Sequence, residues 1–105
     1  MVDLRLSNDK LIRRAITLVK EVAGVEEVVA KQAIIRAIHH AKLDAGEGTI
    51  EEMGRLESAE HVKAAATQRR IVPTAVLLAL GKCETVAEAK KILRKQPLST
   101  VLDST

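Results

Sequence analysis

The sequence predicts a mainly α-helical protein, a compact bundle of about five to six helices, with a short N-terminal β-strand as an optional addition. Apolar residues recur at helical spacing through most of the chain. Helix-capping residues, glycines and prolines separate these apolar stretches. The chain contains no Phe, Tyr or Trp, so its core must be built from Val, Ile, Leu and Ala.

The N-terminal residues favour a strand followed by a helix. Residues 2–6 alternate between apolar and polar, which is typical of a short strand. Ser7 is suited to cap the helix that follows, and Gly24 is suited to end it. Between them, a broad apolar stripe recurs every three to four residues.

Two further helices are predicted before the middle of the chain. The first spans about residues 26–44, with Lys31, Gln32 and Arg36 facing outward. Its inner face is predicted to consist of Ala30, Ile34, Ala37, Ile38 and Ala41. A short helix over about residues 50–56 begins at a capping box.

The C-terminal half predicts three helices and a tail. Ser58 is expected to cap a helix over about residues 59–70. Pro73 fits the first turn of the next helix, which has no polar face and should be central and buried. A capping box begins the last helix, residues 86–95, and residues 98–105 are expected to be a loose tail. Residues 1–105 are therefore predicted to form a single helical domain.

Composition and cysteine content predict a cytoplasmic protein without a membrane partner. The longest apolar run, residues 75–80, is too short to cross a bilayer, and the N-terminus carries charges where a signal peptide needs apolar residues. The single cysteine, Cys83, cannot form an internal disulfide, which fits a reducing compartment.

The absence of aromatic residues narrows the classes of ligand. Single-stranded nucleic acids are usually bound by stacking bases on aromatic rings, and cation cages also need such rings. The net charge of +3 and the pI of about 9.2 permit a duplex nucleic acid as a partner without requiring one. Recognition of a protein surface through Arg, Met or Leu remains open.

No group of residues argues for catalysis, a metal or a cofactor. His39, His40 and His61 lack the spacing of zinc ligands and are interpreted as surface histidines. Cys83 lies in a predicted turn, and nothing in the sequence places a base beside it, so it is interpreted as an incidental thiol. We therefore expect a binding or regulatory protein rather than an enzyme.

The N-terminal third resembles the ribbon-helix-helix family. The resemblance rests on the segment from Val2 to Asp9, the amphipathic helix after it, Gly24 and a second apolar helix. In that family, strands of two chains pair and enter the major groove of DNA. The resemblance implies that Arg5 and Ser7 face base edges and that Lys10 contacts phosphate. Asp3, Glu26 and Glu27 depart from such a surface, and the alternative is an N-terminal arm packed on the bundle.

A second basic candidate surface lies in the C-terminal half. Lys90, Lys91, Arg94 and Lys95 occupy neighbouring turns of the last predicted helix, and Arg69 and Arg70 could extend the same surface. A solvated helix face is the alternative. Residues 75–102 also resemble the helical tail of the N-acetylmuramic acid 6-phosphate etherases, but their sugar-binding domain is absent, so no activity is carried over.

Two hypotheses about function follow. The first is a homo-oligomeric regulator that binds double-stranded DNA. The alternative is a helical module or accessory subunit that binds another protein and does not contact nucleic acid. In either case, helices rich in Val, Ile, Leu and Ala are expected to leave an apolar stripe that a symmetric dimer would cover.

Overall fold

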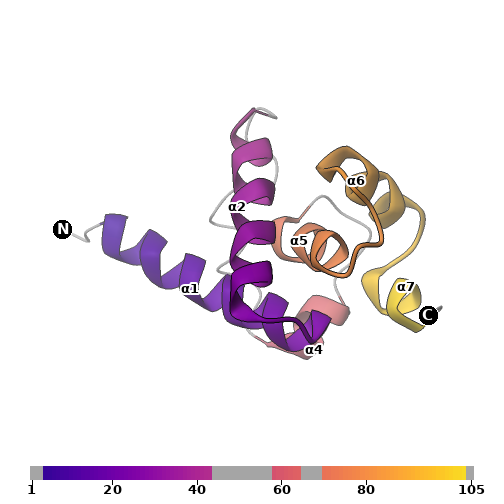
Figure 1. The fold of residues 1–105 in the computed structure, drawn as a ribbon, viewed down its shortest axis with the longest axis horizontal. Helices are drawn as coiled ribbons and strands as arrows, with labels where there is room; N and C mark the ends of the chain where they lie inside the picture. The colour runs from indigo at the N-terminus through magenta and orange to yellow at the C-terminus, as the bar shows by residue number, and fades with distance from the viewer. Residues whose placement is uncertain (1–3, 44–57, 65–69, 104–105) are drawn as a thin grey trace.

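The computed structural model describes residues 4–43, 58–64 and 70–103, and within these ranges it contains six α-helices and no strand (Figure 1). The helices are α1 (Leu4–Ala23), α2 (Glu27–Leu43), α4 (Ala59–Lys63), α5 (Ile71–Ala79), α6 (Val86–Lys95) and α7 (Leu98–Asp103). This confirms the predicted mainly α-helical bundle. The predicted helix over residues 50–56 and the site residue Arg69 lie outside the described residues.

The prediction of an N-terminal strand is wrong for the positions that the structure describes. Leu4, Arg5 and Leu6 already belong to α1, and Ser7 lies inside that helix rather than capping it. Alternation over five residues is too short to exclude a helix. Leu4 also lies one heptad before Leu11, which places both on one side of a helix. The helical stripe therefore begins earlier than the alternation suggests.

Helices α1 and α2 are joined by a tight turn. Gly24 adopts a positive φ of 67°, and its amide donates a 2.9 Å hydrogen bond to the Lys20 carbonyl. A side chain at this position would be strained, so glycine ends α1 as predicted. The two helices then pack against each other, and both contact α5.

Helix α5 is the centre of the core. All residues from Ile71 to Leu78 are buried, which confirms the prediction of a central helix without a polar face. Helices α1, α2, α4 and α6 all contact α5 (Figure 1). Gly81, with φ of 73°, ends the segment, and the amide of Lys82 bonds back to the Leu77 carbonyl.

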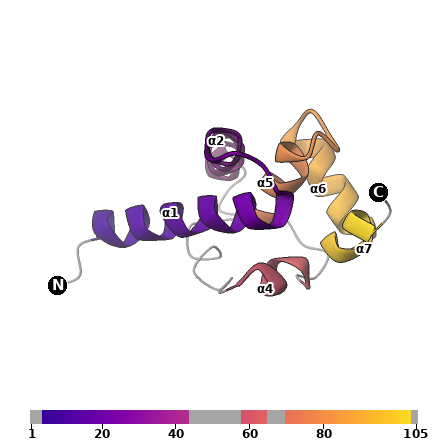
Figure 2. The same ribbon diagram turned by 60° about the horizontal axis from the view of Figure 1, so that its bottom comes forward.

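The other helices of the second half of the chain lie on different sides of the bundle. Helix α6 lies against α5 and α2, whereas α4 contacts α1, α5 and α7. Viewed along α2, α4 and α2 lie on opposite sides of α1 (Figure 2). The N-terminal part of α1 projects beyond the other helices, and the molecule measures 45 × 28 × 22 Å (Figures 1 and 2).

The caps predicted for α4 and α6 are present. The hydroxyl of Ser58 accepts a 3.1 Å hydrogen bond from the His61 amide, and that of Thr85 accepts a 3.2 Å bond from the Glu88 amide. These bonds satisfy amides that have no partner within their own helix. Helix α6 has the predicted bounds, whereas α4 ends at Lys63 with Ala64 as its C-cap, so the helix predicted over residues 59–70 is shorter than expected.

Removing the α6 cap tests this local account. We expect Thr85→Ala to lower the free energy of unfolding by about 1 kcal/mol, because the Glu88 amide loses its acceptor. Thr85→Ser keeps the hydroxyl and should stay close to the unmodified chain. Urea unfolding followed by circular dichroism measures both, and equal losses for the two variants would contradict the capping role.

The predicted loose tail is wrong over most of its length. Residues 98–103 form α7, and the side chains of Leu98 and Val101 are buried. The carbonyl of Pro97 accepts hydrogen bonds from the amides of Thr100 and Val101, so this proline precedes a new helix. Proline ends one helix and is also favoured at the start of the next.

Candidate functional site

The outer face of α2 carries the large apolar side chains that are most exposed in the described part of the chain. Val28 is 63% exposed, Ile35 is 52% exposed and Val29 is 40% exposed. Val28 and Ile35 are one heptad apart and therefore share one side of the helix. Val29 lies roughly 100° further round the helix axis, at the edge of this side. We call these three residues the α2 apolar face.

Helix α2 is thus apolar on two sides. Its inner side is buried against the core through Ala30, Ile34, Ala37 and Ala41, as predicted, and Ile38 is half-buried. Lys31, Gln32 and Arg36 are exposed, also as predicted. The α2 apolar face was not predicted from the sequence. The signal was present, because Val28 and Ile35 fall outside the helical stripe that includes Ala30 and Ile34.

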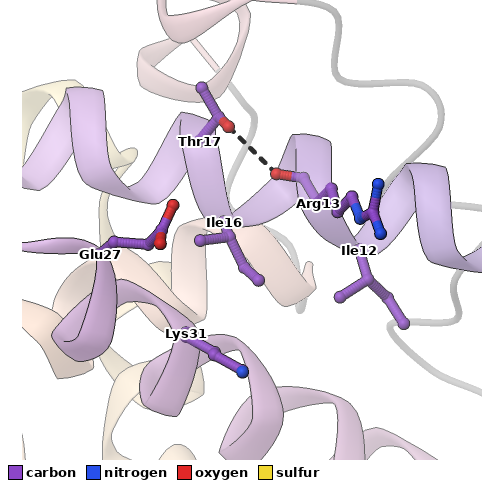
Figure 3. Close-up of a pocket in the computed structure, with 6 residues that line it drawn as sticks. All are labelled: Ile12, Arg13, Ile16, Thr17, Glu27 and Lys31. Carbon is purple, nitrogen blue, oxygen red and sulfur yellow. Dashed lines mark hydrogen bonds between the residues drawn. The ribbon is translucent and has the colours of Figure 1, made fainter.

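A groove of about 600 Å³ lies beside this face, between α1 and α2 (Figure 3). Its lining comes from both helices and consists of Ile12, Arg13, Ile16, Thr17, Glu27 and Lys31. Ile12 and Ile16 are half-buried and one turn apart on α1. The hydroxyl of Thr17 donates a 3.1 Å hydrogen bond to the carbonyl of Arg13. The α1–α2 groove therefore combines an apolar floor with charged walls.

Cys83 lies in the turn between α5 and α6, as predicted, and is buried. Burial raises the pKa of this thiol above its ordinary value of 9.0, and the nearby Glu88 carboxylate raises it further. Arg36 acts in the opposite direction, and its guanidinium also donates a hydrogen bond to the Glu84 carbonyl. A nucleophilic cysteine needs a lowered pKa, so the surroundings of Cys83 favour the unreactive thiol.

The raised pKa predicts a loss of stability at alkaline pH. The folded chain holds the thiol proton to a higher pH than the unfolded chain, so this contribution is complete only well below the ordinary thiol pKa of 9.0. It is lost as the pH rises through the folded value, because the unfolded chain has already released its proton. We expect the urea midpoint to fall between pH 8 and pH 10 by more than in Cys83→Ala. An equal fall of the urea midpoint in the unmodified chain and in Cys83→Ala would contradict this role of the thiol.

The histidines do not form a site in the described residues. His39 and His61 are exposed on different helices, as interpreted from the sequence, whereas His40 is half-buried. No group of three or more His, Cys, Asp or Glu side chains that could hold a metal ion occurs within the described ranges. No helix within those ranges is both long enough and apolar enough to span a membrane.

The predicted nucleic-acid residues are dispersed. Arg5 and Ser7 are in α1, Lys10 is exposed on the same helix, and Arg70 is half-buried beside the start of α5. On α6, Lys91, Arg94 and Lys95 are exposed, but Lys90 is buried with only 8% of its surface accessible. Lys90 lies one turn from both Val86 and Leu93, which are buried, and this spacing was the signal that was missed.

Comparison with known proteins identifies a family. The family model described as the C-terminal lid domain of glucokinase regulatory protein matches residues 1–101. Among curated relatives, glucokinase regulatory protein of Xenopus laevis is 27% identical over 105 residues, covering 99% of this chain and 16% of the relative. The protein of the same name from Homo sapiens is 28% identical over 97 residues, covering 92% of this chain and 15% of the relative. No solved structure matches.

These matches overturn the prediction of a DNA-associated regulator. They point to a regulatory protein-binding domain and favour the alternative hypothesis, in which another protein is the partner. The structure supplies a physical reason, because a DNA-reading ribbon needs an N-terminal strand, and the chain is helical from Leu4 onward. Arg5, Ser7 and Lys10 therefore belong to a helix instead of a ribbon.

The extent of the match settles the assignment. The chain spans about a sixth of the length of the curated relatives, and the matched region includes all six described helices except the end of α7. The α2 apolar face and the α1–α2 groove both lie within it. The chain therefore belongs to the family of the C-terminal lid domain of glucokinase regulatory protein.

Proposed function

We propose that this chain is a regulatory protein-binding domain whose partner is a kinase of the glucokinase type. The match of residues 1–101 to the lid-domain family carries the proposal, because the named relatives are regulators of glucokinase. The relatives are about six times as long as this chain, so the binding of a kinase by these residues alone is part of the proposal.

The α2 apolar face is the proposed contact surface. Exposed apolar side chains that gather on one helix are typical of protein-binding sites. Valine and isoleucine have few rotamers, so the face loses little side-chain entropy on binding. Gln32 and His39 are exposed and share the side of α2 that carries Val28 and Ile35. This mixture of apolar and polar groups suits a partner that binds and dissociates.

The test measures binding of the chain to purified glucokinase by sedimentation velocity or biolayer interferometry. We expect Val28→Asp combined with Ile35→Asp to weaken binding roughly 100-fold, because two apolar contacts are lost and two charges are desolvated. Ala87→Asp on α6 is the control for a carboxylate added at an exposed helical position elsewhere. All variants should retain the unmodified circular dichroism spectrum.

Two results would overturn the proposal. If the unmodified chain does not bind the kinase at all, a kinase of the glucokinase type is rejected as the partner. Alternatively, the double variant could bind as tightly as Ala87→Asp, which removes the α2 apolar face as the contact surface.

The predicted homo-oligomer would use the same face. A second copy could cover Val28 and Ile35 in a symmetric pair, as expected from the apolar composition of the helices. Sedimentation of the chain alone at micromolar concentrations tests this prediction, and a mass of 11.4 kDa would contradict it. Cytoplasmic location and a single domain over residues 1–105 likewise stay predictions.

A further inference from the structure

The α1–α2 groove has a chemical character distinct from that of the α2 apolar face beside it. Its floor is formed by Ile12 and Ile16, which project from α1 toward α2 (Figure 3). Both are half-buried, so part of each side chain remains available to a ligand. The N-terminal part of α1 projects beyond the other described helices (Figures 1 and 2).

The groove and the α2 apolar face are neighbours. Lys31 lines the groove, and it lies one turn from both Val28 and Ile35 along α2. A partner segment seated on Ile12 and Ile16 would therefore also reach the side of α2 that carries these two residues. The inference accordingly rests on the proposed function and concerns the chemistry of the partner at the same site.

The charges of the groove are unequal. Arg13 on α1 and Lys31 on α2 provide cations on opposite walls, and both are exposed. Lys10, one turn before Arg13, is exposed as well. Among the described residues of the lining, Glu27 is the acidic one. Neither Arg13 nor Lys31 has an ion-pair partner within the described ranges. The groove thus favours a ligand with more carboxylates than cations.

Three recurring modes of peptide recognition can be compared with this groove. Addition of a β-strand needs an open sheet edge, and the described residues contain no strand. Recognition of a polyproline helix uses grooves lined by aromatic side chains, and the chain has none. Docking of an amphipathic helix needs a groove between helices with apolar side chains as anchors, and Ile12 and Ile16 supply such anchors between α1 and α2.

We propose that the α1–α2 groove binds an acidic amphipathic helix of another protein. The apolar side of that helix packs on Ile12 and Ile16, and its carboxylates face Arg13 and Lys31. A single cation near one end of the helix would be suited to Glu27. Such a mode combines apolar anchors, which supply affinity, with charges, which set orientation and rate of association.

The test uses two synthetic helical peptides with identical leucine anchors that differ only in their flanking charges, glutamate in one and lysine in the other. Each is titrated into the full chain carrying labelled methyl groups, and NMR shifts are recorded. The glutamate peptide should shift the Ile12 and Ile16 methyls and bind roughly tenfold more tightly than the lysine peptide. Its affinity should fall as salt is added.

Charge reversal provides the matched comparison. Arg13→Glu with Lys31→Glu should weaken the glutamate peptide and strengthen the lysine peptide, so that the preference reverses. Lys91→Glu with Arg94→Glu changes the net charge equally, but on the exposed side of α6, and should leave the preference unchanged. Reversal in both variants, or in neither, would overturn the proposal.

Other outcomes separate this inference from the proposed function. Equal affinity for both peptides, or shifts confined to methyls outside the groove, overturn the acidic helix while kinase binding through the α2 apolar face can persist. If the Ile12 methyl signal shifts with the concentration of the chain when no peptide is present, the groove binds a second copy of the chain. That result would also overturn the acidic-helix proposal. Binding of the glutamate peptide without binding of glucokinase supports the groove and rejects the kinase as the partner.

Discussion

Leu77→Ala is expected to lower the free energy of unfolding by about 3 kcal/mol. Leu77 is fully buried on α5, the helix that α1, α2, α4 and α6 all contact. Truncation removes apolar contacts and leaves a cavity that surrounding helices can fill only in part. The chain has no aromatic side chains whose bulk could move into that space.

Urea unfolding followed by circular dichroism measures this loss. Val28→Ala is the control, because Val28 is 63% exposed and its truncation should change the free energy by no more than about 0.5 kcal/mol. A loss below about 1 kcal/mol for Leu77→Ala would contradict a central position for α5.

Leu98→Ala is expected to cost about 2 to 3 kcal/mol, because α7 is part of the packed structure. Leu98 is fully buried, and α7 contacts α4. Truncation should therefore loosen α7 and the attachment of α4. The loose tail expected from the sequence implies no change at all.

Thermal or urea unfolding distinguishes the two views of this segment. Asp103→Ala, at an exposed position of the same helix, serves as the control and should have little effect. Similar small effects of both substitutions would show that the C-terminal segment contributes nothing to stability and would contradict the packing of α7.

The helices that could be predicted from the sequence are those with strong local signals at their ends. For α6, Thr85 and Glu88 define the start, and the segment extends over the expected residues 86–95. For α5, the unbroken apolar run implied burial on every side, and the structure agrees. Such elements are specified locally, so neighbouring helices need not be known.

The N-terminus and C-terminus were predicted less well, because short patterns fit more than one structure. The alternation of residues 2–6 is compatible with a strand, yet α1 begins at Leu4. After Pro97, Leu98 and Val101 are spaced as on a helix, but six residues give only a weak periodic signal. Packing against the rest of the chain decides both cases.

The candidate site depends on tertiary structure that the sequence does not reveal. Ile12 and Ile16 belong to an ordinary amphipathic stripe, and only the crossing of α1 and α2 leaves them facing a groove. Lys90 shows the converse, because it was grouped with exposed cations although its helical position buries it. Residue type alone therefore grouped a buried lysine with exposed cations and favoured nucleic acid as the partner.

The most direct test of protein binding through α2 is a titration of the methyl-labelled chain with unlabelled glucokinase, followed by NMR. The account predicts that the methyl signals of Val28, Val29 and Ile35 broaden first, whereas those of the buried Val76 in α5 change little. The absence of any change would contradict kinase binding. Broadening that begins at Ile92 or Leu102 instead would place the interface on the opposite half of the chain and contradict the assignment to α2.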